Sequence, residues 1–396
     1  MLLKRFDDLM SHIRSLHGFE NFLEGPSKSE LYSLTRNGPI VVFNVSDIRS
    51  DAFLITNHEI RVVHLPSLTS NSVEDMTRRF LKAIKNQTLR FYSVSKAEVN
   101  TVLAWLWDDA VKPILDQLGI TQIPCDGPWP RVWWVGSGLL NVLPIHASGY
   151  HDSTPRQTAL DRVISSYAPT VKSLSYARTR VSEPKQSTLE EKAILIAMPV
   201  TPELKGKDLP SVETEIKHFE NLFSKTSIEL QVKRNPTRIE ALLELPECAI
   251  VHFSCHGFST ENPSQSSFYL KDWKTSPLTV LDLTSLNIKS AKFAYLSACH
   301  TAAMRDVHLL DESINLSSAI QLSGYPSIVG SLWQVGDTHS AQVARDVYEW
   351  MLEDVGVNPE LAAEGLHKAL RELREKTRLF GIHDPLVWAP YIHIGI

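Results

Sequence analysis

The chain has 396 residues, of which 43% are hydrophobic and 21% charged, and its formal net charge is -5 at pH 7. These proportions are those of an ordinary globular protein with room for one large or two medium-sized domains. The negative charge provides no general attraction to phosphate backbones or anionic membranes, so we expect no nucleic acid and no membrane as partner. The stretch from Met1 to Phe19 is interrupted by charges, and no other segment is apolar over the thickness of a bilayer. We therefore expect a cytoplasmic protein with reduced thiols.

Apolar residues recur at helical spacing from Leu2 to Leu16, which predicts an amphipathic helix at the start of the chain. This helix has little to pack against before Gly25, so we expect further helix, or a partner, to cover it. Three short strands follow, over residues 39–46, 52–56 and 59–65. Helices are then predicted over 73–85 and 96–118, with a kink near Pro113, and a strand over 131–138.

Beyond a linker at residues 181–191, apolar strands alternate with helices. The strands are predicted over 193–200, 228–234, 249–257, 292–301, 325–337 and 390–396. Continuous apolar strands separated by helices are typical of a mostly parallel sheet that is covered on both faces, so an α/β fold is expected. We divide the chain into a helix and linker (1–37), a first subdomain (38–190) and a second subdomain (191–396).

Two of these strands end in reactive residues, Cys255-His256-Gly257 and Cys299-His300-Thr301. Ligand sites in parallel sheets form beyond the carboxyl ends of the strands, and neighbouring strands lie only about 4.8 Å apart. If the two strands are neighbours, side chains at their ends can meet without a long loop to position them. The sequence therefore predicts a site at this edge of the sheet.

A cysteine and a histidine brought together there suit acyl transfer. The pKa of a free thiol is about 8.5, and a nearby imidazole favours the thiolate and can later protonate a leaving amine. Alternation along a strand directs Cys255 and His256 to opposite faces, and His252 lies mid-strand, where a buried, hydrogen-bonded structural histidine is expected. We therefore pair His256 with Cys299. The backbone amides of Gly257 and Cys299 are candidates for binding a developing oxyanion.

A zinc site is the rival interpretation, because two Cys-His dipeptides supply a Cys2His2 set. Adjacent residues of an extended chain diverge, however, and the expected CxxC and HxxxH spacings are absent. We therefore expect no metal and no other cofactor.

At these residues the sequence resembles the CHAT domain family, a group of caspase- and separase-related peptidases often attached to tetratricopeptide repeats. The resemblance rests on an ordered series of segments that spans roughly residues 38 to 396. They include LPSVETEI (209–216), HFSCHG (252–257), LSACHT (296–301), SLWQVGD (331–337) and WAPYIHIGI (388–396).

The resemblance implies a caspase-like fold in the second subdomain, with the first as a degenerate companion. It implies that His256 is the general acid and base, that Cys299 is the nucleophile, and that Gly257 provides an oxyanion amide. It further implies control by a partner or by an upstream repeat region. His300 is expected to point away, and Asp311 and Glu312 either help to gate the site or are simply solvated.

The segment with Trp333 and Asp337 resembles the part of separase-like proteins that forms the pocket for a basic side chain. An aspartate there would pair with Arg or Lys of a substrate. Asp337 equally suits the N-terminal cap of a following helix that starts near Ser340. Trp333 fits the core better than a pocket, because an aromatic residue at the end of an apolar strand is usually buried.

Three functions remain open for the sequence. The first is a cysteine endopeptidase that acts on protein or peptide substrates and possesses a His-Cys dyad. The second is a catalytically inactive scaffold or interaction module with the same fold. The third is an acyltransferase, or another cysteine enzyme without proteolytic activity, that uses the same pair.

Overall fold

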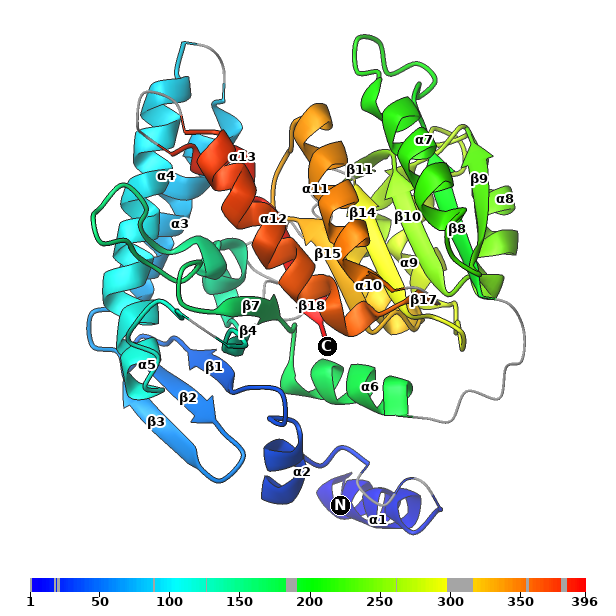
Figure 1. Ribbon diagram of the computed structural model, residues 1–396. Coiled ribbons are helices and arrows are strands. Elements are labelled where there is room, and N and C mark those ends of the chain that lie inside the picture. Colours follow the sequence, from blue (N-terminus) through cyan, green and yellow to red (C-terminus); the bar gives the residue numbers. More distant parts are fainter. Residues whose placement is uncertain are drawn as a thin grey trace.

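The computed structural model describes residues 2–17, 19, 22–87, 90–125, 127–182, 191–260, 262–297, 316–353, 356–378 and 383–396. The strands of the main sheet are β1 (Ile40–Asn44), β2 (Asp51–Ile55), β3 (Ile60–His64), β4 (Arg131–Val135), β7 (Ile164–Tyr167), β8 (Lys192–Ala197), β9 (Glu229–Arg234), β10 (Ile250–Ser254), β14 (Phe293–Ser297), β15 (Ser327–Ser331) and β18 (Tyr391–Gly395). Within the described ranges these 11 strands form one sheet in the order β3-β2-β1-β4-β7-β18-β15-β14-β10-β8-β9 (Figure 1).

Smaller strands lie outside this sheet. They are β5 (Gly149–Tyr150) with β6 (Gln157–Thr158), β11 (His256–Phe258) with β12 (Ser267–Tyr269) and β13 (Leu278–Thr279), and β16 (Leu352–Glu353) with β17 (Gly356–Val357). The helices are α1 (Leu2–Arg14), α2 (Lys28–Ser33), α3 (Ser70–Lys85), α4 (Tyr92–Leu106), α5 (Lys112–Gln117), α6 (Val171–Ser182), α7 (Ser211–Phe223), α8 (Arg238–Glu244), α9 (Val280–Thr284), α10 (Leu316–Ser323), α11 (Asp337–Met351), α12 (Ala362–Lys376) and α13 (Pro385–Trp388).

The main sheet is mostly parallel, as the sequence predicts. The antiparallel pairs are β1–β2, β2–β3 and β15–β18, and the other neighbours in the order run parallel. Every residue of β10, β15 and β18 is buried, so both faces of the sheet are covered there. Helices α7, α11 and α12 pack side by side along the second half of the sheet (Figure 1). The predicted α/β fold with a mostly parallel sheet is therefore confirmed.

The predicted helix over 96–118 is interrupted. Helix α4 ends at Leu106, a π-helical turn covers Trp107–Val111, and α5 begins at Lys112 with Pro113 in its first turn. Proline has no backbone N–H and its ring clashes with the carbonyl four residues earlier, so a regular α-helix cannot run through this position. In place of the kink expected near Pro113, the structure thus has a π-helical turn immediately before α5.

The two halves of the chain share the sheet through β7 and β18, where Tyr167 pairs with Ile394. A buried ion pair also joins them, because Arg374 of α12 donates to both carboxylate oxygens of Asp161 at 2.8 and 2.7 Å. The division at residues 190 and 191 remains a prediction, since residues 183–190 lie outside the described ranges.

The opening helix α1 exposes apolar side chains. Phe6 and Leu9 are both 57% exposed, whereas Met10 is buried. The structure thus has the amphipathic helix that the periodicity predicts, and the covering segment or partner remains a prediction. None of the helices in the described part of the chain is long and apolar enough to cross a bilayer.

Candidate functional site

The two strands that precede the candidate dyad lie next to each other. β10 and β14 are parallel, with Ile250 opposite Phe293 and Ser254 opposite Ser297. The site expected from the sequence depends on this adjacency, and the structure has it. Each strand ends two residues before a candidate catalytic residue, His256 in one case and Cys299 in the other. Cys299 lies outside the described residues, as do His300, Asp311 and Glu312.

His256 begins β11 and is half-buried. Its Nε2 atom lies 2.7 Å from the carbonyl oxygen of Lys207, in the segment that leads into α7. A carbonyl oxygen only accepts hydrogen bonds, so Nε2 must carry the hydrogen of this bond. The other ring nitrogen, Nδ1, is then the atom that remains for proton exchange. Lys207 contributes only its backbone, so no side-chain pattern in the sequence could have indicated it.

The neighbours of His256 occupy different environments. Gly257 is half-buried and pairs with Phe268 across β11 and β12. Cys255 is buried in the hydrophobic core. His252 is buried, as predicted, and its ring stacks on Tyr295 with centroids 4.9 Å apart. Neither of its ring nitrogens has a hydrogen-bond partner in the described part of the chain, so the expectation that it is hydrogen-bonded is wrong; its Nε2 atom lies 3.7 Å from Oε2 of Glu215.

Asp337 does not cap its own helix. α11 begins at Asp337 itself, earlier than the expected start near Ser340, and the preceding residue Gly336 is its N-cap. The Asp337 carboxylate instead accepts a hydrogen bond of 2.8 Å from the backbone N–H of Ser211, the first residue of α7. Helices leave their first N–H groups without intrahelical partners, so this aspartate satisfies one of them on a neighbouring helix. Its proposed role in a pocket remains a prediction.

Trp333 is a packing residue in this structure. It is 1% exposed, its ring contacts Phe80 edge-on at 5.4 Å, and its Nε1 donates to the carbonyl of Leu386 at 3.2 Å. A ring so completely covered has almost no free surface for a substrate side chain. The core interpretation therefore describes the observed environment of Trp333, and a pocket at this residue would require its neighbours to move.

Glu215 has no role expected from the sequence, yet its carboxylate lies at the ends of both strands. The Ser254 hydroxyl donates to its Oε2 atom, and the Ser297 hydroxyl donates to its Oε1 atom at 3.1 Å. Glu215 is 4% exposed. One signal could have found it, because Glu215 falls on the apolar stripe of α7 with Val212, Ile216 and Phe219. A carboxylate on a core-facing stripe requires buried partners.

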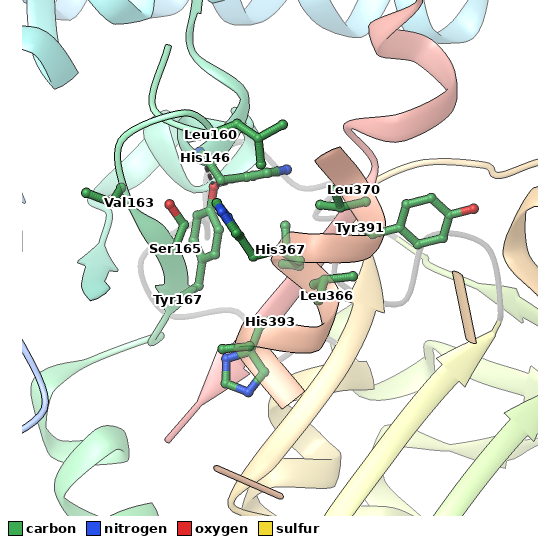
Figure 2. Close-up of a pocket in the computed structure, with 12 residues that line it drawn as sticks. His146, Leu160, Val163, Ser165, Tyr167, Leu366, His367, Leu370, Tyr391 and His393 are labelled. Atoms are coloured by element: carbon green, nitrogen blue, oxygen red, sulfur yellow. Dashed lines mark hydrogen bonds between the residues drawn. The ribbon is translucent and has the colours of Figure 1, made fainter. Parts of the chain in front are cut away.

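A second group of polar side chains surrounds a small cavity between the two halves (Figure 2). His146 and Tyr167 are hydrogen-bonded there at 2.8 Å, and His367 projects toward them from α12. The cavity measures about 10 Å³, which is room for one water molecule at most. Burial lowers the pKa of His146 and of His367 to about 3. These histidines are therefore neutral parts of the core, and the cavity is too small for a substrate.

No group of three or more His, Cys, Asp or Glu side chains suited to a metal ion occurs within the described ranges. The rival zinc interpretation required Cys299 and His300, which lie outside them.

Comparison with known proteins identifies the family. The profile of the CHAT domain matches residues 100–396, which is most of the chain. The chain belongs to the CHAT domain family. The match begins within α4, so residues 38–99, which were expected to belong to the resemblance, lie outside it. A search of curated proteins found no matching sequence.

Superposition on a separase chain supports the observed fold. A chain of the separase–securin complex from Saccharomyces cerevisiae superposes with a TM-score of 0.61 at 12% identity, and the match covers 93% of this chain. It covers 31% of that chain, so this CHAT protein spans about a third of the length of its structural neighbour. The Arg-specific cysteine proteinase gingipain R matches with a TM-score of 0.45 at 11% identity, over 91% of this chain and 77% of its own. The CHAT domain match and the superposition on the separase chain together show a caspase-like fold.

Proposed function

We propose that this CHAT protein is a cysteine endopeptidase in which His256 and Cys299 form the catalytic dyad. The observation that carries the proposal is the parallel register of β10 and β14, in which Ser254 lies opposite Ser297. His256 and Cys299 each follow these residues by two positions, and two residues of chain span at most about 7 Å. The proposal thus requires only that the two-residue segments after β10 and β14 turn toward each other.

The reaction follows from the ring geometry at His256. With Nε2 hydrogen-bonded to the Lys207 carbonyl, Nδ1 accepts the thiol proton of Cys299, and the thiolate attacks the carbonyl carbon of the scissile bond. The amides of Gly257 and Cys299 bind the oxyanion. His256 then gives the proton to the leaving amine, and water hydrolyses the thioester, which restores the thiol and releases the acid.

Specificity for a basic residue is the second part of the proposal. Asp337 is half-buried and belongs to the first turn of α11, and its carboxylate is the group that we propose to pair with Arg or Lys of the substrate. Trp333 would line the same pocket only after a rearrangement that uncovers its ring. We further propose a cytoplasmic protein whose activity is controlled by a partner or by an upstream repeat region.

A thiol-reactive peptide that ends in arginine tests the proposal. We expect the probe to label the wild-type protein at Cys299, as mapped by mass spectrometry, and a peptide library to be cleaved after basic residues. Cys299→Ala should abolish both signals. His256→Ala should abolish cleavage while the protein stays folded, because His256 is half-buried at the start of β11 and does not fill the core.

The outcome also separates the alternative functions. If wild-type protein is folded but Cys299 reacts with the probe no faster than in the His256→Ala variant, the chain is a scaffold and the peptidase proposal fails. If Cys299 is activated but only acyl donors other than peptides are turned over, the chain is an acyltransferase.

A further inference from the structure

A buried polar cluster lies at the point where β10 and β14 end. We call Glu215, Ser254, Ser297 and Ser340 the strand-end cluster. The two strand serines donate to the carboxylate of Glu215, one to each oxygen atom. The Ser297 and Ser340 hydroxyl oxygens lie 2.8 Å apart. Ser297 has only one hydroxyl hydrogen and uses it toward Glu215, so Ser340 is the donor in this last contact.

The cluster connects four elements of the fold. Glu215 belongs to α7, Ser340 to α11, and the other two members are the last residues of β10 and β14. Ser254 and Ser297 are register partners in parallel strands, so their side chains leave the same face of the sheet. One carboxylate therefore bridges the ends of both strands from above.

Neighbouring contacts hold Glu215 in place. One turn earlier on α7, the backbone N–H of Ser211 donates to Asp337 at the start of α11. One turn later, the Phe219 ring packs against His252 of β10 at 4.8 Å and against Tyr348 of α11 at 4.6 Å. The His252 ring also faces the carboxylate, with its Nε2 atom 3.7 Å from Oε2 of Glu215. The helix that bears the carboxylate is thus fixed to both the strand and the neighbouring helix on either side of Glu215.

Packing alone does not explain a carboxylate at this position. Burial of a carboxylate is unfavourable unless hydrogen bonds compensate it, and an apolar side chain of similar volume often stabilises a core as well or better. The remaining members of the α7 stripe are apolar. What the carboxylate provides, and an apolar side chain would not, is a fixed distance between the ends of two strands.

We infer that Glu215 is a positioning residue for the dyad: through Ser254 and Ser297 it sets the distance and direction in which the chain leaves β10 toward His256 and leaves β14 toward Cys299. The inference rests on the proposed function. Displacement of a reacting group by about 1 Å can reduce a reaction rate by about 100-fold. Hydrogen bonds two residues away from His256 and from Cys299 therefore affect the reactivity of the dyad without contact to the substrate.

The pH dependence of Cys299 alkylation by iodoacetamide tests this role, because the small reagent needs no substrate pocket. In Glu215→Leu we expect alkylation below about pH 7 to slow by about tenfold or more and its pH profile to move toward that of His256→Ala. Glu215→Gln should stay within about threefold of wild type, because its amide oxygen accepts from Ser254 while its NH2 group donates to Ser297.

Glu213→Leu is the matched control, since Glu213 lies on the exposed side of the same helix and pairs with Arg234. Its alkylation profile should equal that of wild type. Ser254→Ala and Ser297→Ala provide smaller changes in case Glu215→Leu does not fold. Each removes one link, and each should slow alkylation while the thermal midpoint remains above the assay temperature.

The results separate the inference from the function on which it rests. If Glu215→Leu folds and keeps the wild-type pH profile, the positioning role is overturned while the dyad stands. If that variant does not fold, folded serine variants with the wild-type pH profile have the same consequence. A wild-type protein whose Cys299 profile equals that of His256→Ala overturns the dyad, and the positioning role is lost with it.

Discussion

The cysteines outside the proposed dyad have contrasting surroundings. Burial raises the pKa of the Cys248 thiol to about 12, and the nearby Glu244 carboxylate adds to this effect. Cys125 is exposed in a loop. Because the thiolate is the form that reacts, the two residues should differ strongly in reactivity even though both are free thiols.

We predict that iodoacetamide modifies Cys125 in the native protein at least about 100-fold faster than Cys248 near neutral pH. Peptide mapping of the alkylated protein at successive times measures the two rates. In denaturant, where burial is lost, both should react at similar rates. Rapid native modification of Cys248 would show that the segment just before β10 opens to solvent.

The site could be predicted only in part from individual residues. His256 follows an apolar run and precedes a glycine, and this pattern is visible in the sequence, although the predicted strand is divided: β10 ends at Ser254 and β11 begins at His256. Glu215 and the Lys207 carbonyl were not found, because their roles depend on a helix and a loop that approach the strand ends from elsewhere in the chain. Such contacts follow from tertiary packing, which local patterns do not encode.

At the scale of helices and strands, Asp337 shows how one side chain serves two elements. It opens α11 and satisfies the first backbone N–H of α7 at 2.8 Å. A capping contact of this kind typically contributes about 1 kcal/mol. Its charge, by contrast, is required only for the proposed recognition of a basic substrate residue.

Two substitutions separate these roles. Asp337→Ala should lower the free energy of unfolding by about 1 kcal/mol, because the Ser211 N–H loses its acceptor. Asp337→Asn keeps an acceptor oxygen and should be nearly as stable as wild type in urea unfolding. Both variants should lose the preference for Arg over Leu in peptide cleavage. If Asp337→Asn retains that preference, the pocket assignment is wrong.

Elements were easier to predict than their connections. The buried strands of the second half are continuous apolar runs, and β10, β14 and β15 lie within the predicted segments. Asn358 caps the next helical segment, which has Pro359 in its first turn. The π-helical turn at Trp107–Val111 was not predicted, since it depends on how α4 and α5 adjust to Pro113 within a packed core.

At the scale of the whole molecule, neutral histidines are buried where the halves meet. Burial lowers the pKa of His151 and His367 to about 3, and nearby arginines act in the same direction. Burial also holds the pKa of His393 well below its usual value. An unfolded chain binds protons at these residues below about pH 6.5, whereas the folded protein does not until a much lower pH.

We therefore predict that stability is full above about pH 6.5 and falls as the pH is lowered toward about 3, since the unfolded state binds more protons throughout that window. Each such histidine contributes a slope of up to about 1.4 kcal/mol per pH unit. Urea unfolding at several pH values measures it. His367→Leu should reduce this slope. Little stability should be lost at pH 7, because Nε2 of His367 has no hydrogen-bond partner within the described ranges. An unchanged slope would contradict the prediction.

The position of β18 has a consequence for biosynthesis. This strand follows all the other strands of the sheet in the sequence, yet it lies between β7 and β15. While the ribosome adds the second half, which takes on the order of tens of seconds, β7 has an open edge able to recruit strands from other nascent chains. The first half is thus most vulnerable to misassembly before its final partner emerges, and chaperones that shield strand edges should matter most in that interval.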